Sequence, residues 1–92
     1  MDFAEKIKQG RENLGITLSQ ASESLGISIG YLSDFEHGRA TKIKMNFIYD
    51  CSSLYGISVD DLCVSANKIP KDIYFKIINN PKIFSEIRNL KV

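Results

Sequence analysis

The sequence predicts an all-α protein, and three observations support that prediction. Apolar residues recur every three or four positions along most of the chain, as they do on one face of a packed helix. Glycines and helix-capping residues separate these periodic segments at short intervals. No segment has the period-two alternation typical of a half-buried strand. We therefore expect a five-helix domain over residues 1–66 and a two-helix extension over residues 67–92.

The composition is that of one ordinary globular domain. The 92 residues are 43% hydrophobic and 25% charged, which is typical of such domains. No apolar run approaches the roughly 18–20 residues that span a membrane, and the N-terminal MDFAEKIKQG lacks the apolar core of a signal peptide. We therefore expect a cytoplasmic protein that does not associate with membranes.

The first expected helix covers residues 3–14. Asp2 can cap its N-terminus, and Gly15 provides the backbone freedom that ends a helix. Its predicted inner face consists of Phe3, Ile7, Gly10 and Leu14.

Residues 17–39, TLSQASESLGISIGYLSDFEHGR, predict two short helices joined by a tight turn. The first, over 18–25, begins with a Thr-x-x-Gln capping box and ends at Gly26. Ser28 can cap the second, over 29–37, only two residues later. The inward-facing residues are Leu18, Ala21, Ser22, Leu25, Leu32 and Phe35. This spacing is typical of a helix-turn-helix motif, whose second helix can lie in the major groove of DNA as a recognition helix.

The remaining helices follow a basic loop, RATKIK. A helix over 45–55 and a short one over 59–64, capped by Ser58, complete the five-helix domain. Their inward residues are predicted to be Met45, Ile48, Tyr49, Ser52, Tyr55, Val59 and Leu62. Pro70 and Pro81 suit first helical turns, so the extension should contain helices over 70–79 and 81–90. One side of each is apolar: Ile73, Tyr74, Ile77 and Ile78 in one, and Ile83, Phe84, Ile87 and Leu90 in the other.

The apolar faces of the extension need a partner surface, because the five-helix domain should already be compact. They can pair with a second copy, pack back on the domain, or bind a different protein. We favour a homodimer, since helix-turn-helix proteins usually bind two half-sites as symmetric dimers. The predicted dimerisation residues are Ile73, Tyr74, Ile77, Ile83, Phe84 and Ile87.

Charge is unevenly distributed, although the net charge is only +1. Residues 1–38 carry a net −3 and residues 45–66 another −3, whereas residues 39–44 carry +3 and residues 67–92 carry +4. Positive charge is therefore concentrated directly after the expected recognition helix and in the extension, where it could meet nucleic acid.

Residues 3–64 as a whole resemble the Xre/Cro family of bacterial and phage regulators. The matching features are the T-L opening, the L-G-I-S turn, the Y-L-S of the second helix, the E-x-G-R exit and, further on, LYGISVDDL. The resemblance implies a lambda-repressor-like five-helix fold, double-stranded DNA as the partner, and repression as the usual activity. It also implies that Arg11 and Glu36 form an ion pair that links the first helix to the end of the recognition helix.

The residues themselves support that pair. Glu36 lies in the last turn of a helix, where the helix dipole disfavours a negative charge, so it needs a cation. Arg11 is the candidate, and the alternative is a solvated Glu36 that pairs with His37 or Arg39.

The expected groove-facing residues are Ile29, Gly30, Ser33 and Asp34. Ile29 could contact thymine methyl groups, and Ser33 could bond several bases. Asp34 could accept from a cytosine amino group but would be repelled by phosphates; alternatively, it is a solvated surface charge. Few side chains here suit base readout, so low base specificity, or a site read mainly through DNA shape, is a reasonable expectation.

The sequence offers more candidates for contacts to DNA phosphates than for contacts to bases. Amides at helix starts and the loop cations can bind phosphates without reading sequence. The predicted phosphate-contacting residues are Thr17, Leu18, Ser28, Tyr31, Arg39, Lys42 and Lys44. The alternative for the RATKIK loop is an ordinary solvated basic loop.

No catalytic or metal-binding constellation is evident. The chain has a single histidine, His37, and no GxGxxG, Walker or HExxH motif. Cys51 and Cys63 form no CxxC pair, so we expect buried free thiols and neither a disulfide nor a zinc site. We expect no enzyme activity, cofactor, metal or small-molecule ligand. The sequence predicts a dimeric DNA-binding regulator, and the alternative is a helix-turn-helix fold used for protein binding.

Overall fold

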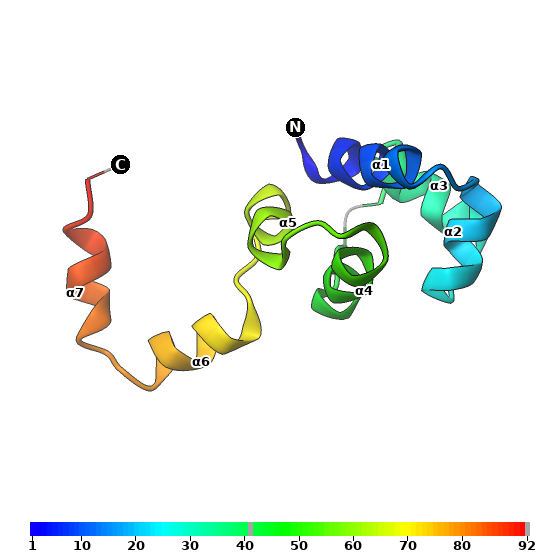
Figure 1. The fold of residues 1–92 in the computed structure, drawn as a ribbon. Helices are drawn as coiled ribbons and strands as arrows, with labels where there is room; N and C mark the ends of the chain where they lie inside the picture. The colour runs from blue at the N-terminus through cyan, green and yellow to red at the C-terminus, as the bar shows by residue number, and fades with distance from the viewer. Residues whose placement is uncertain (41, 92) are drawn as a thin grey trace.

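We analysed a computed structural model that describes residues 1–40 and 42–91. Within these residues all regular secondary structure is helical, which confirms the all-α prediction (Figure 1). The helices are α1 (Phe3–Leu14), α2 (Leu18–Leu25), α3 (Ile29–Glu36), α4 (Met45–Tyr55), α5 (Val59–Ser65), α6 (Lys71–Ile78) and α7 (Ile83–Arg88).

Local capping explains where the first helices begin and end. The side chains of Asp2, Ser28 and Ser58 each accept a hydrogen bond from the amide three residues later. Gly15 and Gly26 end α1 and α2 in the left-handed conformation, with φ of 71° and 68°. Because these signals are local, the sequence predicts the bounds of α1 and α2 to the residue. The predicted bounds of α4 also agree, although Lys44 at its N-cap makes no side-chain capping bond.

The hydrophobic core lies among α1 to α5. Helix α1 contacts α3, α4 and α5, while α2 packs against both α3 and α4. Three aromatic rings of the core lie together. The ring of Phe35 stacks on that of Phe47, with 4.3 Å between centroids, and the centroid of Phe3 lies 6.4 Å from that of Phe35. The buried apolar residues are Phe3, Ile7, Ala21, Leu25, Leu32, Phe35, Phe47, Ile48, Cys51, Leu62 and Cys63.

One core assignment from the sequence was wrong, and another was incomplete. Leu14 is 48% exposed, because it is the last residue of α1 and lies where the chain turns away from the core. In α4 the predicted Ile48 is buried and the predicted Met45 and Tyr55 pack against the core, but the predicted stripe omitted the buried Phe47. Helix α4 packs against α1, α2 and α5, so its buried face is wider than the single stripe that the periodicity suggests.

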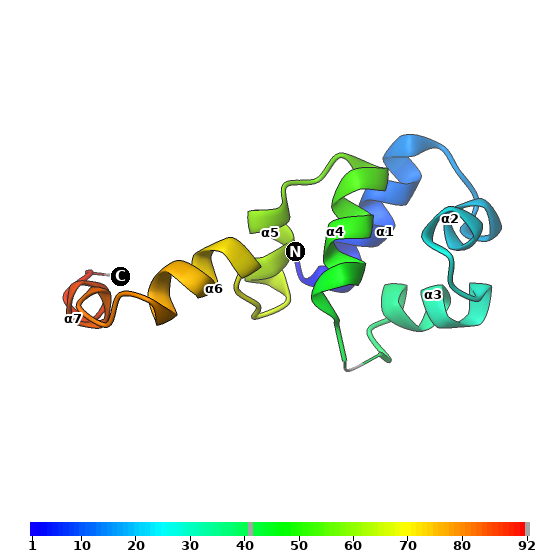
Figure 2. The ribbon, with the colours of Figure 1, turned by 90° about the horizontal axis from the view of Figure 1, so that it is seen from below.

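The extension leaves the five-helix domain and does not fold back over it (Figures 1 and 2). Neither α6 nor α7 contains a buried residue. The described chain is accordingly elongated, with extents of 46 × 24 × 23 Å. Of the predicted dimerisation residues, Ile73, Tyr74, Phe84 and Ile87 are 40–50% exposed, whereas Ile77 and Ile83 are partly buried. The alternative in which the extension packs back on the domain is therefore not seen in this structure.

Candidate nucleic-acid interface

Helices α2 and α3 form a closely packed pair joined by a short turn. Gly26 ends α2, and the Ile27 amide donates back to the Ser22 carbonyl oxygen at 3.0 Å. Ala21 and Ser22 are buried, and their small side chains allow the helices to approach. The Ser22 hydroxyl donates to the Ser19 carbonyl oxygen at 2.9 Å, so its polar group is satisfied. This arrangement is a helix-turn-helix, with α3 in the place of the recognition helix.

A buried ion pair holds the end of α3. The Arg11 Nε donates to Glu36 Oε2 at 2.8 Å, and its Nη2 donates to Oε1 at 3.0 Å. The Glu36 side chain is only 3% exposed and that of Arg11 is 16% exposed. The hydrogen bond to Glu36 raises the pKa of Arg11 above its usual value, against the opposing effect of burial.

The same guanidinium reaches the start of the motif. Arg11 Nη1 donates to the Ile16 carbonyl oxygen at 3.1 Å, just before α2. One side chain of α1 therefore ties the approach to α2 and the end of α3 together. Glu36 does not use the alternatives that the sequence offered, because His37 Nδ1 lies 2.7 Å from the Ser33 carbonyl oxygen and Arg39 bonds elsewhere.

The outer face of α3 is mixed in character. Ile29 is 50% exposed and Tyr31 is 44% exposed, and Gly30 lies between them. A Cβ atom built on Gly30 would meet nothing within 4 Å, so the fold itself does not require glycine there. Ser33 and Asp34 are partly buried. The predicted groove-facing residues thus lie on α3 as expected, but they present one large apolar side chain and few hydrogen-bonding groups.

Asp34 is paired and is not an isolated acid. Arg39 Nε donates to Asp34 Oδ1 at 3.0 Å, with 59% and 49% of the respective side chains exposed. The pair reduces the repulsion that Asp34 would exert on phosphates. The pair also uses one donor of the Arg39 guanidinium, its Nε. The other two cations of the loop, Lys42 and Lys44, are both exposed.

Side chains at the starts of α2 and α3 form capping hydrogen bonds with nearby amides. The Thr17 amide donates to Gln20 Oε1 at 2.9 Å, and the Gln20 amide donates to the Thr17 hydroxyl at 3.0 Å, so the capping box is complete. The Thr17 amide is therefore already bonded within the protein. The Ser28 hydroxyl accepts from the Tyr31 amide at 3.1 Å.

Tyr31 and Lys44 line the same hollow beside α3. The sequence named each as a phosphate contact but did not predict that they would lie close together. The hollow has a volume of about 240 Å³ and is also lined by two polar residues of α4, Asn46 and Asp50, and by four apolar residues. Sequence reasoning missed Asn46, although a polar residue directly after a basic loop was the available signal. Tyr31, Lys44 and Asn46 could contact a DNA backbone, whereas the Asp50 carboxylate in the same hollow would repel its phosphates.

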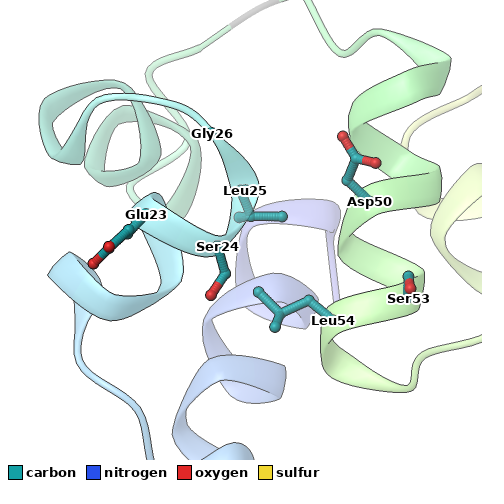
Figure 3. Close-up of a pocket in the computed structure, with 7 residues that line it drawn as sticks. All are labelled: Glu23, Ser24, Leu25, Gly26, Asp50, Ser53 and Leu54. Atoms are coloured by element: carbon teal, nitrogen blue, oxygen red, sulfur yellow. The ribbon is translucent and has the colours of Figure 1, made fainter.

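A larger hollow lies on the α2–α4 side, shares Asp50 with the hollow beside α3, and has no lysine or arginine among the described residues that line it. Its volume is about 500 Å³, and its lining includes the carboxylates of Glu23 and Asp50 and the hydroxyls of Ser24 and Ser53. Figure 3 shows Leu25 between the two acidic side chains. Two carboxylates would repel phosphates, so this side of the domain does not suit a nucleic-acid backbone.

Other kinds of site receive no support from the described residues. Within residues 1–40 and 42–91, no cluster of histidine, cysteine, aspartate and glutamate could hold a metal ion. Both cysteines are buried free thiols, and burial raises the pKa of Cys51 to about 12. No helix in the described part of the chain is both long and apolar enough to cross a membrane.

The fold and the α2–α3 geometry define a helix-turn-helix protein, and sequence comparisons agree. Residues 4–68 match the family model described as a helix-turn-helix domain, so the chain belongs to this family. The chain is 36% identical to the HTH-type transcriptional regulator DdrOP3 of Deinococcus deserti over 62 residues, which are 67% of this chain and 47% of the relative. It is 32% identical to the HTH-type transcriptional regulators SinR of Bacillus subtilis and of Bacillus licheniformis over 60 residues, which are 65% of this chain and 54% of each relative. The chain thus spans about half the length of the curated relatives it matches.

Proposed function

We propose that this protein is a sequence-specific, DNA-binding transcriptional regulator of the Xre/Cro type that acts as a repressor. The observation that carries the proposal is α3, which the buried Arg11–Glu36 pair holds at its end while Ile29, Gly30 and Tyr31 stay exposed. The names of its relatives, all HTH-type transcriptional regulators, support the same class. A repressor of this kind acts by occupancy, because a bound protein excludes polymerase from the promoter.

Two kinds of contact would hold the DNA. Helix α3 would enter the major groove, where Ile29 can contact thymine methyl groups and Ser33 can bond base edges. The basic loop after α3, together with Tyr31, would contact phosphates and set the register. Because α3 offers few polar side chains, sequence preference should depend partly on DNA shape.

We propose that the extension supplies dimerisation. Large apolar side chains of α6 and α7 are 40% or more exposed, among them Ile73, Tyr74, Phe84 and Ile87. A second copy would cover them, and each apolar side chain moved out of water contributes about 25 cal/mol per Å² of buried area. A two-fold dimer would present two copies of α3 to two symmetric half-sites.

The test is selection of binding sites from a random duplex pool, with the mass of the protein in solution measured in parallel. An enriched, two-fold-symmetric site and a dimer mass are the expected results. Lys42→Gln and Lys44→Gln should each lower the slope of log affinity against log salt by about 0.9, while Lys8→Gln on α1 should leave it unchanged. A promoter–reporter assay with the selected site then distinguishes repression from activation.

The alternative is a helix-turn-helix fold that serves mainly as a protein-binding module. The net −3 charge of residues 1–38 and the few side chains on α3 that suit base readout favour it. Absence of duplex binding at low salt would refute the regulator proposal and support this module. Binding without enrichment of any sequence would keep the phosphate contacts but refute sequence-specific recognition.

A further inference from the structure

The hydrogen-bond acceptor at the start of α6 comes from a residue of α4 and not from the first turn of α6 itself. Pro70 occupies the N-cap position, and its side chain cannot accept a hydrogen bond from the helix amides. The Lys71 amide instead donates to the hydroxyl of Tyr49 at 3.2 Å, across 22 positions of sequence. A tyrosine of another helix thus takes the place of a capping residue.

The Lys71 side chain adds two further contacts to the same helix. Its ammonium lies 5.8 Å from the centroid of the Tyr49 ring, within the range of a cation–π interaction. Its Nζ also lies 3.4 Å from Asn46 Oδ1. The backbone and the side chain of a single residue of α6 therefore both contact α4, through Tyr49 and Asn46.

These contacts are important because α6 has little else to fix it. It is eight residues long, and isolated helices of that length are marginal in water. None of its residues is buried. Figure 2 shows α6 leaving the five-helix domain next to α5 and continuing away from it. The direction of the extension depends on how its first turn is held.

We propose that Tyr49 and Lys71 are positioning residues that fix the direction of the extension relative to α3. The inference rests on the proposed dimer: if two extensions pair, the direction of α6 sets the separation of the two α3 helices. That separation in turn selects the spacing of the DNA half-sites. Tyr49 would thereby influence operator choice without contacting DNA.

Three variants of the full chain separate the parts of this contact. Tyr49→Phe removes the acceptor hydroxyl and keeps the ring. Lys71→Met removes the ammonium and keeps the amide donor. Lys76→Met is the matched control, because Lys76 lies on the same helix and makes no side-chain hydrogen bond or ion pair with the described residues.

The first readout does not involve DNA. Amide exchange at Lys71, measured by NMR, should become about fivefold faster in Tyr49→Phe, which is the effect of losing one ordinary hydrogen bond. Backbone order parameters of α6 should fall relative to those of α4. The second readout is selection from a pool of paired half-sites with spacers of varied length. The unchanged protein should enrich one spacing, Tyr49→Phe and Lys71→Met should enrich a wider range, and Lys76→Met should behave as the unchanged protein.

Each result has a definite meaning. Unchanged exchange and order parameters in Tyr49→Phe would overturn the proposal, whatever the DNA result. Faster exchange with an unchanged spacing preference would also overturn it, because the contact would then hold α6 without positioning the dimer. If the unchanged protein enriches no paired sites, the dimeric regulator itself fails, and the order parameters alone decide whether Tyr49 directs the extension.

Discussion

Replacing Arg11 by methionine should destabilise the domain strongly, because it leaves Glu36 buried without its cation. The substitution removes hydrogen bonds of 2.8 and 3.0 Å to a carboxylate that is 3% exposed. Removing one partner of a buried ion pair costs about 3–5 kcal/mol. Arg11 itself retains 16% exposure, so water can reach part of the site, and we expect the lower end, about 3 kcal/mol.

That loss is a large share of the roughly 5–15 kcal/mol that stabilises a typical domain. It should lower the melting temperature by about 12–24 °C, measured by circular dichroism at pH 7. Glu36→Met should cost less, because the remaining guanidinium is more exposed and still donates to the Ile16 carbonyl oxygen at 3.1 Å. The double variant should lie close to the unchanged protein, since an apolar replacement of a buried pair is often neutral.

The exposed Asp34–Arg39 pair provides the matched control. Its side chains are 49% and 59% exposed, and such pairs contribute about 0–1 kcal/mol. Arg39→Met should therefore change the free energy of unfolding by less than about 1 kcal/mol. If Arg11→Met costs no more than Arg39→Met, the buried pair does not hold the end of α3, and the reasoning is refuted.

Three further predictions concern packing, the recognition helix and pH. Gly10→Ala should cost about 1–3 kcal/mol, because the added Cβ would lie 2.8 Å from Ile57 Cδ1 and 2.9 Å from Tyr55 Cβ; an unchanged midpoint of urea denaturation would contradict this. Gly30→Ala should instead raise the free energy of unfolding by up to about 1 kcal/mol, because its Cβ would meet nothing within 4 Å. If the DNA backbone approaches α3 there, titration should show weaker DNA binding by this more stable variant. Stability should fall as pH rises from 9 towards 12, since burial raises the Cys51 pKa from 9.0 to about 12 and only the unfolded thiol loses its proton in this range. The loss should be roughly 1 kcal/mol between pH 9 and 10, and Cys51→Ala should reduce it.

Most of the secondary structure could be predicted because its signals are local. The Thr17–Gln20 capping box, Gly26 and Ser28 lie within one turn of the helix ends they define. The extension was predicted less closely, since α7 begins at Ile83, two residues after Pro81. Pro81 fixes only its own backbone angle and loses an amide donor, so it permits a helix start without requiring one at that residue.

The candidate interface could be predicted only in outline. The sequence placed Ile29, Gly30, Ser33 and Asp34 on α3, because helical periodicity assigns residues to faces. It did not show that Arg39 would bond Asp34, since both residues had other possible partners. That arrangement depends on how the chain leaves α3, which no periodic pattern describes.

The sequence by itself determined the helices, the turn between α2 and α3, and the separation of charge along the chain. These follow from hydrogen bonds and side-chain patterns within a few residues. The Arg11–Glu36 pair, 25 positions apart, was expected from the family resemblance and the helix dipole, but only the tertiary structure shows its geometry and burial. Only the tertiary structure decided that α4 would bury Phe47 and that Tyr49 would cap α6. Burial and long-range pairing depend on which helices lie side by side, and that is a property of the packed chain as a whole.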